Sequence, residues 1–125
     1  MGTMAQATQN EDLLIVEDND QMRVTLTRTL EHDFAEVAAA ASGEEALEIF
    51  KKKKYRVVLT DFNMPGITGA QLAELILRKN PETLVIGTSV NNDPQTVTAF
   101  KRAGAKGFLP KEDICQLSDM VASLN

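Results

Sequence analysis

Short apolar runs alternate with longer amphipathic stretches from Leu13 to the end of the chain. The clearest run, Leu13-Leu14-Ile15-Val16, holds no polar residue and stops at an acidic pair. An uninterrupted aliphatic run of this length is typical of a strand that is buried on both faces of a parallel sheet. By the same criterion we predict strands at residues 13–16, 34–41, 55–60, 83–88 and 105–109, of which the alanine-rich 34–41 has the weakest pattern.

Each predicted strand is followed by a stretch with helical periodicity. Asn19 or Asp20 provides an N-cap before the first helix, and Ser42 followed by Glu45 is the pattern of a capping box before the second. The apolar stripes of these helices have spacings close to one helical turn. They are Met22, Leu26 and Leu30; Ala46, Leu47 and Phe50; Leu72, Leu75 and Ile76; Val97 and Phe100; and Ile114, Leu117, Val121 and Leu124.

This alternation predicts an α/β protein with a parallel sheet and helices on both of its faces. At 125 residues the chain has the length of a single domain, which we place at residues 11–125. Residues 1–10 lack an apolar period and are expected to form a flexible leader, whose first residues, before Met4, are typical of a cloning remnant.

Net charge and rare residues narrow the functional classes. The chain has 13 Lys and Arg against 18 Asp and Glu, and the resulting charge of −5 opposes binding to nucleic acid or to an anionic membrane. The single cysteine, Cys115, excludes an internal disulfide and a cysteine zinc site, and the single histidine, His32, disfavours a histidine-rich metal site. The sequence has neither a membrane-spanning run nor a secretory signal at its start, so we expect a cytoplasmic protein.

Polar and charged side chains stand where four of the predicted strands end. Glu17-Asp18 follow the first strand, Asp61 follows the third, Thr88-Ser89 close the fourth, and Lys111 comes after the fifth. The carboxyl ends of parallel strands meet at one edge of the sheet, where ligands bind in such folds. We therefore expect these side chains to converge.

The converging side chains suit phosphoryl transfer. Crowded carboxylates repel one another and need a cation, and ligands that are all oxygens favour a hard divalent ion such as Mg²⁺. Asp61 could then act as a nucleophile toward a phosphoryl group. Mg²⁺, Lys111 and a hydroxyl group could neutralise the phosphoryl oxygens.

Four segments carry a family resemblance: LIVEDND at 14–20, LTDFNMPGITG at 59–69, VIGTS at 85–89 and GAKGFLPK at 104–111. In order and spacing they resemble the signatures of CheY-like receiver domains, the response regulators of two-component signalling. Successive intervals from Asp18 through Asp61 and Ser89 to Lys111 are 43, 28 and 22 residues. The resemblance covers about residues 11–125. It implies a flavodoxin-like (βα)5 three-layer sandwich with the parallel strand order 2-1-3-4-5.

The resemblance also implies roles for the residues at the strand ends. Asp61 would accept a phosphoryl group from a histidine kinase or a phosphotransfer protein, and Lys111 would pair with it. Asp18 would bind Mg²⁺ directly, Glu17 through water, and Asn63 through its backbone carbonyl, with Asp61 completing the site.

Two further positions correspond to the family's switch. Ser89 would be the hydroxyl that moves toward the phosphoryl group, although the adjacent Thr88 competes for this role because one step along a strand reverses the face. Phe108 would be the aromatic residue that turns inward, and it also suits a plain core position. The helix after strand 83–88, strand 105–109 and the last helix would then form the surface for an output domain, a partner or a homodimer.

Two departures from the family pattern concern the site. Glu17 stands where aspartate is commoner, and a water-mediated contact accommodates the extra methylene. Lys111 precedes Glu112, whereas the family usually has a proline there in a cis bond. Because a cis bond before a residue other than proline costs about 3–4 kcal/mol, we predict either a trans bond with a shifted loop or a strained cis bond.

Three alternative functions remain at this stage. An aspartate-nucleophile phosphohydrolase would act on external substrates, but it usually has a second acid where Asn63 stands. A flavin carrier would need a phosphate-binding loop after the first strand, where Glu17-Asp18-Asn19-Asp20 would repel phosphate. A degenerate receiver would act only through protein contacts, against which Asp61, Asp18 and Lys111 argue. Both a whole regulator and a fragment of a longer regulator or hybrid kinase are compatible with the sequence.

Overall fold

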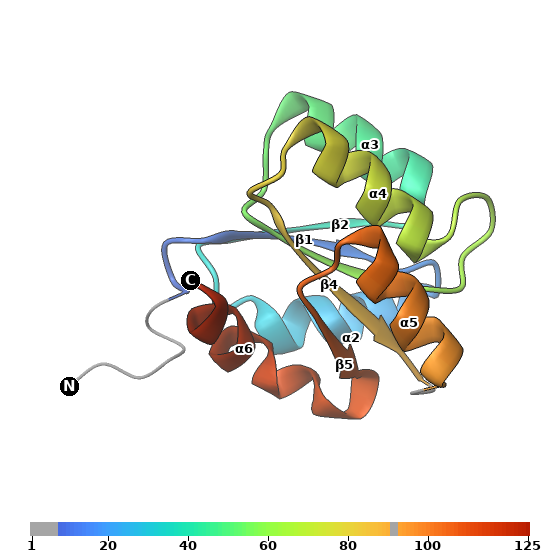
Figure 1. The fold of residues 1–125 in the computed structure, drawn as a ribbon. Helices are drawn as coiled ribbons and strands as arrows, with labels where there is room; N and C mark the ends of the chain where they lie inside the picture. Colours follow the sequence, from blue (N-terminus) through green and yellow to red (C-terminus); the bar gives the residue numbers. More distant parts are fainter. Residues whose placement is uncertain (1–7, 91–92) are drawn as a thin grey trace.

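The computed structural model describes residues 8–90 and 93–125 (Figure 1). Most of the predicted leader, residues 1–7, lies outside this part of the chain. Within the same predicted range, residues 8–10 form a turn. Thr8 is buried there, and its hydroxyl donates to the carbonyl of Asp33 at 2.5 Å.

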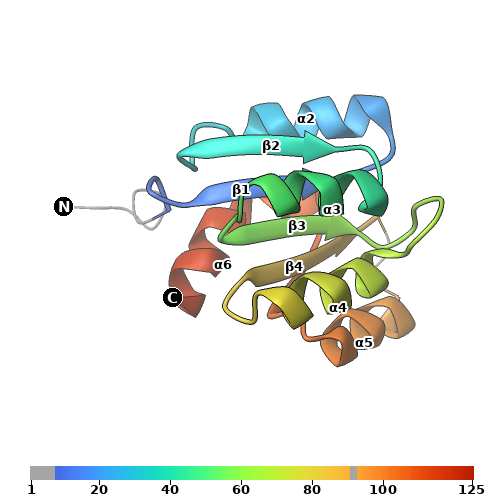
Figure 2. The same cartoon turned by 90° about the horizontal axis from the view of Figure 1, so that it is seen from above.

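Five parallel strands form one sheet in the order β2-β1-β3-β4-β5, which confirms the predicted fold class and strand order. Figure 2 shows β2, β1, β3 and β4 side by side in this order. The strands are β1 (Asp12–Val16), β2 (Glu36–Ala40), β3 (Val57–Asp61), β4 (Leu84–Ser89) and β5 (Gly107–Pro110). Every residue of the central strands β3 and β4 is buried, as their continuous apolar runs predict. The edge strand β2 is mostly half-buried, in keeping with its weaker pattern.

Helices cover both faces of the sheet (Figure 1). On one face lie α3 (Gly43–Lys52), α4 (Gly69–Lys79) and α5 (Pro94–Ala103), and on the other lie α2 (Asp20–Leu30) and α6 (Leu117–Leu124). Two separate apolar cores fill the interfaces between sheet and helices. Alternate residues of each central strand enter opposite cores, as Leu13 and Leu14 of β1 do.

The observed helix caps agree with the predicted ones only in part. Asn19 caps α2 by accepting the Met22 amide at 2.8 Å. The predicted capping box at Ser42 is incomplete, because the Glu45 carboxylate accepts from the amide of Ala41 instead of that of Ser42. A complete capping box is found instead at the start of α4, between Thr68 and Gln71.

The last predicted helix is divided into two parts. Residues Lys111–Gln116 form a 3₁₀ helix, η1, in which Asp113 departs from helical geometry, and α6 begins only at Leu117. Ile114 of the predicted stripe therefore belongs to η1, although it is buried in the same core as Leu117 and Val121. This 3₁₀ turn directly follows β5 and carries Lys111 at the carboxyl edge of the sheet.

Candidate phosphoryl-acceptor site

The carboxyl edge of the sheet gathers three carboxylates. Glu17 and Asp18 follow β1, and Asp61 is the last residue of β3. One oxygen from each lies within 4.8 Å of the others. Glu17 and Asp61 are buried and Asp18 is exposed, so the cluster has one side open to solvent. The structure thus brings these three side chains together, as the sequence predicts.

Lys111 supplies the positive charge in this cluster. Its Nζ lies 2.5 Å from Oε1 of Glu17 and 3.4 Å from Oδ2 of Asp61. No peptide bond between described residues is cis, so the bond from Lys111 to Glu112 is trans and leads into η1. The trans alternative is therefore the one observed, and the lysine still reaches both buried carboxylates.

Arg23 of α2, a residue that the sequence analysis did not single out, forms hydrogen bonds with the loop after β1. Its guanidinium donates to the carbonyl of Glu17 at 2.9 Å and, at the longer distance of 3.5 Å, to that of Asp18. It also pairs with Asp20 at 2.6 Å. The second carboxylate oxygen of Glu17 accepts the Asn19 amide at 3.1 Å. These contacts fix the backbone from which both acidic side chains project.

The electrostatics of the cluster favour a bound cation. Burial raises the pKa of Asp61 above its ordinary value, and the nearby Glu17 carboxylate raises it further, while Lys111 and the Phe62 amide act in the opposite direction. Among the described residues, three carboxylates gather at this edge and the Lys111 ammonium pairs with two of them. A divalent ion would relieve the remaining repulsion, and a donor set composed only of oxygens fits Mg²⁺.

The remaining predicted site residues lie around this cluster. Thr88 is opposite Asp61 in the ladder between β3 and β4 and is buried, and its hydroxyl has no hydrogen-bond partner among the described residues. Ser89 comes one step later and is also buried. Asn63 is exposed in the loop after β3, and Phe108 is half-buried on β5.

Comparison with known proteins identifies the family. The sequence profile of the response regulator receiver domain matches residues 13–123. The chain belongs to this family. Response regulator GacA of Pseudomonas viridiflava is 35% identical over 114 residues, which are 90% of this chain and 52% of the relative. Transcriptional regulatory protein DegU of Brevibacillus brevis is 32% identical over 102 residues, or 80% and 43% of the two chains. The receiver thus spans about half the length of the curated relatives it matches.

Solved structures agree with this assignment. Chemotaxis protein CheY4 of Vibrio cholerae superposes with a TM-score of 0.81 at 26% identity, covering 90% of this chain and 98% of the other. The receiver domain of the regulator NarL from Mycobacterium tuberculosis gives a TM-score of 0.77 at 27% identity, covering 94% and 99%. In the described part of this receiver, no helix is both long and apolar enough to cross a membrane.

Replacing Arg23 by lysine is expected to weaken Mg²⁺ binding to this receiver by about tenfold, the lower end of the effect of changing a residue that orients metal ligands. Lysine keeps the charge but loses the planar fork that contacts a backbone carbonyl and the Asp20 carboxylate together. Titration of amide chemical shifts with MgCl₂ measures the affinity. Arg28→Lys on the exposed face of α2 is the matched control, and equal affinities in all three proteins would contradict the assigned role of Arg23.

Proposed function

We propose that this receiver takes a phosphoryl group onto Asp61 from the phosphohistidine of a sensor histidine kinase or of a phosphotransfer protein. The observation that carries the proposal is the position of the Asp61 carboxylate, which lies 3.4 Å from the Lys111 ammonium and within 4.8 Å of oxygens of Glu17 and Asp18. A nucleophile, a counter-charge and oxygen ligands for a cation are thereby combined at one buried strand end.

The proposed step is a displacement at phosphorus. An Asp61 oxygen forms the new bond to phosphorus while the bond to the histidine nitrogen breaks, and the nitrogen keeps the electron pair. Lys111 would transfer its contact from Glu17 to a phosphoryl oxygen. Mg²⁺, held by Asp18, Asp61, the Asn63 carbonyl and, through water, Glu17, would supply further positive charge to the phosphoryl oxygens.

The receiver would act on itself and not on external substrates. Asn63 occupies the position where an aspartate-nucleophile phosphohydrolase usually has its second acid, and we therefore rank that alternative second. Hydrolysis of the acyl phosphate would return the receiver to its starting state. Phosphorylation would change the surface formed by α5, β5 and α6, through Ser89 and Phe108, and so control an output domain, a partner or homodimer formation. We place this activity in the cytoplasm.

The proposal is tested with the purified chain, MgCl₂ and phosphoramidate as a small donor. Intact mass is expected to show one added phosphoryl group, and beryllofluoride is expected to shift the amide resonances around Asp61. Turnover of a generic phosphomonoester would support the phosphohydrolase instead. A protein that gains no mass and shows no beryllofluoride response would overturn phosphoryl acceptance and favour a degenerate receiver.

Replacing Thr88 by valine is expected to raise the free energy of unfolding by about 1 kcal/mol without changing phosphorylation. The substitution keeps the shape of the side chain and removes a buried hydroxyl that has no hydrogen-bond partner in the described structure. Urea denaturation measures the stability, and the mass assay measures phosphorylation. If Thr88 were the switch hydroxyl in place of Ser89, the valine variant would instead lose its response to beryllofluoride.

Thr60→Val is the matched control for this substitution. Thr60 is equally buried in the neighbouring strand, but its hydroxyl donates to the Asp61 carbonyl at 2.9 Å. Valine at residue 60 removes a hydrogen bond that is made, so this variant is expected to be less stable than the wild type. Equal effects of the two substitutions would show that the unpartnered hydroxyl of Thr88 has no energetic consequence.

A further inference from the structure

Three aromatic rings form a continuous contact between the phosphoacceptor and the outer surface of the receiver. Phe100 of α5 is the central ring and is almost fully buried. Its centroid lies 5.6 Å from that of Phe62 in an edge-to-face arrangement and 6.0 Å from that of Phe108. Aromatic pairs at these separations interact favourably beyond the area they bury. Of the two outer rings, Phe62 directly follows Asp61 in the chain, and Phe108 is on β5.

Phe100 is seated directly on the backbone of the sheet. A Cβ placed on Gly87 would lie 2.4 Å from its ring, and one on Gly69 would lie 3.0 Å from it. Glycine at these two positions therefore lets the ring approach β4 and the start of α4 more closely than any other residue would. On this side the ring has no room to move further inward.

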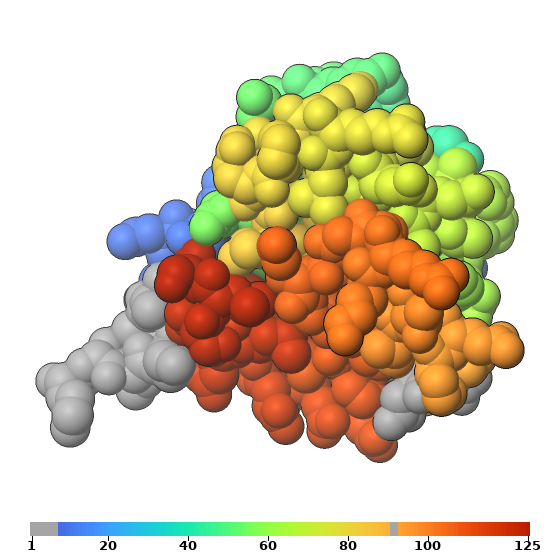
Figure 3. Space-filling view, in the orientation of Figure 1, coloured from blue at the N-terminus to red at the C-terminus, as the bar shows by residue number. Residues whose placement is uncertain are grey.

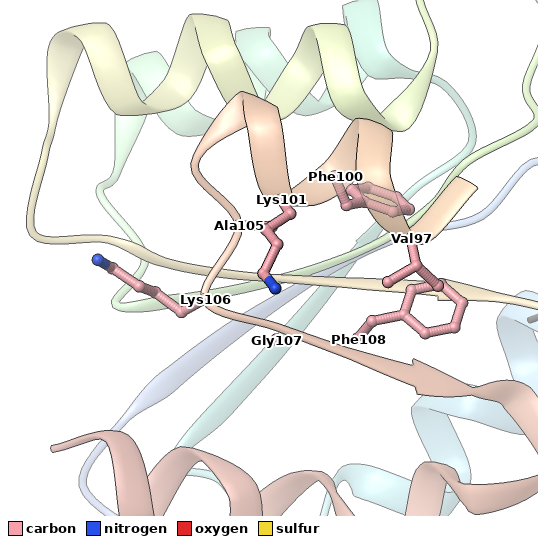
Figure 4. A pocket seen from close by; sticks show the side chains of 7 residues that line it. All are labelled: Val97, Phe100, Lys101, Ala105, Lys106, Gly107 and Phe108. Carbon is pink, nitrogen blue, oxygen red and sulfur yellow. The ribbon is translucent and has the colours of Figure 1, made fainter. Parts of the chain in front are cut away.

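On its other side the ring borders an open cavity. Figure 4 shows Phe100 and Phe108 lining this cavity together with Val97, between α5 and β5. Its volume is about 120 Å³, and Lys101 and Lys106 also contribute to its lining. In the space-filling view, α5 and the segment after β5 adjoin one another on this face (Figure 3). The cavity therefore offers a displaced Phe100 ring space that the side facing Gly87 and Gly69 does not.

Phe62 connects this packing to the Asp61 carboxylate. Its amide donates to Oδ1 of Asp61 at 3.0 Å, and its carbonyl accepts the Gly69 amide at 2.9 Å. Phosphorylation or beryllofluoride binding at Asp61 changes the charge and the lone pairs available to the Phe62 amide. The Phe62 backbone is thus in direct contact with the chemical change, and the side chain on this backbone carries the ring that meets Phe100.

We propose that Phe100 is a positioning residue that transmits the state of Asp61, through the ring of Phe62, to Phe108 and the cavity between α5 and β5. This inference rests on the proposed function and adds a second route beside the hydroxyl of Ser89. Because the sheet backbone blocks the inward direction, a shift of the Phe62 ring is expressed on the cavity side. The cavity surface then changes shape while the strands stay in place.

The test compares amide spectra with and without beryllofluoride and MgCl₂ in the wild type, Phe62→Leu and Phe100→Leu. Phe62 is half-buried, so its leucine variant should fold; Phe100→Leu is the second, independent break in the same contact. In both variants we expect shifts at Glu17 and Asp18 like those of the wild type. Shifts at Lys101, Lys106 and Phe108 should fall by at least about twofold.

Phe50→Leu is the matched control, because Phe50 is a buried ring of α3 in an apolar core and is not one of the three rings in contact. It should keep both sets of shifts. Cavity shifts of wild-type size in Phe62→Leu and Phe100→Leu would overturn the coupling, and so would an equal loss in Phe50→Leu. A wild type that responds only near Asp61 refutes the coupling alone. A wild type that does not respond anywhere refutes the proposed function together with it.

Discussion

Asp61→Asn is expected to slow phosphorylation by phosphoramidate at least about 10³-fold, so that intact mass shows no added group on the time scale of the wild-type reaction. The carboxylate oxygen is the nucleophile of the proposed step, and a carboxamide oxygen is a poor replacement. Asparagine has nearly the same shape, and the Phe62 amide can still donate to its oxygen at the position of Oδ1. The variant should therefore fold and keep the spectrum of a receiver.

Asp119→Asn is the matched control for this prediction. Asp119 is an exposed carboxylate in the first turn of α6, and it has no assigned role in the site. The control should gain the phosphoryl group as fast as the wild type does. A phosphoryl group found on Asp61→Asn at the wild-type rate would mean that another residue is the acceptor.

The sheet could be predicted from the sequence because its central strands are buried on both faces. In Leu13–Val16 and in the apolar parts of β3 and β4, consecutive residues are apolar, so both faces of each strand are buried. Such a run is recognisable as a buried strand from its own residues alone. The edge strand β2 has one neighbour and is mostly half-buried, so its pattern is weaker for the same physical reason. The order of the strands came from the family resemblance and not from the pattern.

The split of the last helix could not be predicted from apolar spacing. Ile114 and Leu117 are three residues apart, an interval that places side chains on one face of a 3₁₀ helix as well as of an α-helix. Both residues accordingly enter the same core although they belong to different elements. The break is at Asp113, whose φ of −104° and ψ of 16° depart from helical values, and apolar spacing carries no information about it.

The sheet topology predicts that the site residues lie at one edge of the sheet. It does not predict which of them form ion pairs with one another. Parallel strands bring Glu17 and Asp61 to one edge whatever their rotamers are. Lys111 lies closer to Glu17 than to Asp61, and the order of the strands does not specify which carboxylate it contacts. The role of Arg23 is not evident from the pattern, because a charged residue on an amphipathic helix usually faces solvent. The signal for it in the sequence is an arginine about one helical turn beyond an acidic loop.

Lys111→Met is expected to lower the free energy of unfolding of the metal-free receiver by about 3 kcal/mol at neutral pH, the effect of removing one partner from a buried ion pair. The lysine side chain is only 11% exposed, and the Glu17 and Asp61 side chains that it contacts are 2% and 10% exposed. Methionine preserves much of the apolar stem. The loss would therefore come from the two carboxylates left without their shared cation.

The loss of unfolding free energy in Lys111→Met should grow as the pH rises above the ordinary pKa of aspartate. Burial and Glu17 raise the pKa of Asp61 in the folded state, and Lys111 opposes them, so its removal raises this pKa further. An acid with a raised folded pKa binds more protons folded than unfolded, so stability falls as pH rises from the ordinary aspartate pKa of about 3.9 to the folded value. The pH range between the unfolded and the folded pKa of Asp61 is wider in the variant than in the wild type. Within this range, the difference in unfolding free energy between wild type and variant should grow with pH. Below it, where Asp61 is protonated in both the folded and the unfolded state, the difference should be smaller.

Urea denaturation across this range, in the presence of a chelator and then of MgCl₂, measures both effects, with the exposed Lys54→Met as control. Without Lys111, Glu17 no longer has an internal counter-ion, so Mg²⁺ should stabilise the variant more than it stabilises the wild type. A deficit that is independent of pH and unchanged by Mg²⁺ would mean that Lys111 contributes through packing alone. A deficit that grows with pH and is reduced by Mg²⁺ would show that the Lys111 ammonium supplies part of the positive charge that the metal can also supply. In the proposed function, this ammonium would then be available to pair with a phosphoryl group once Mg²⁺ is bound.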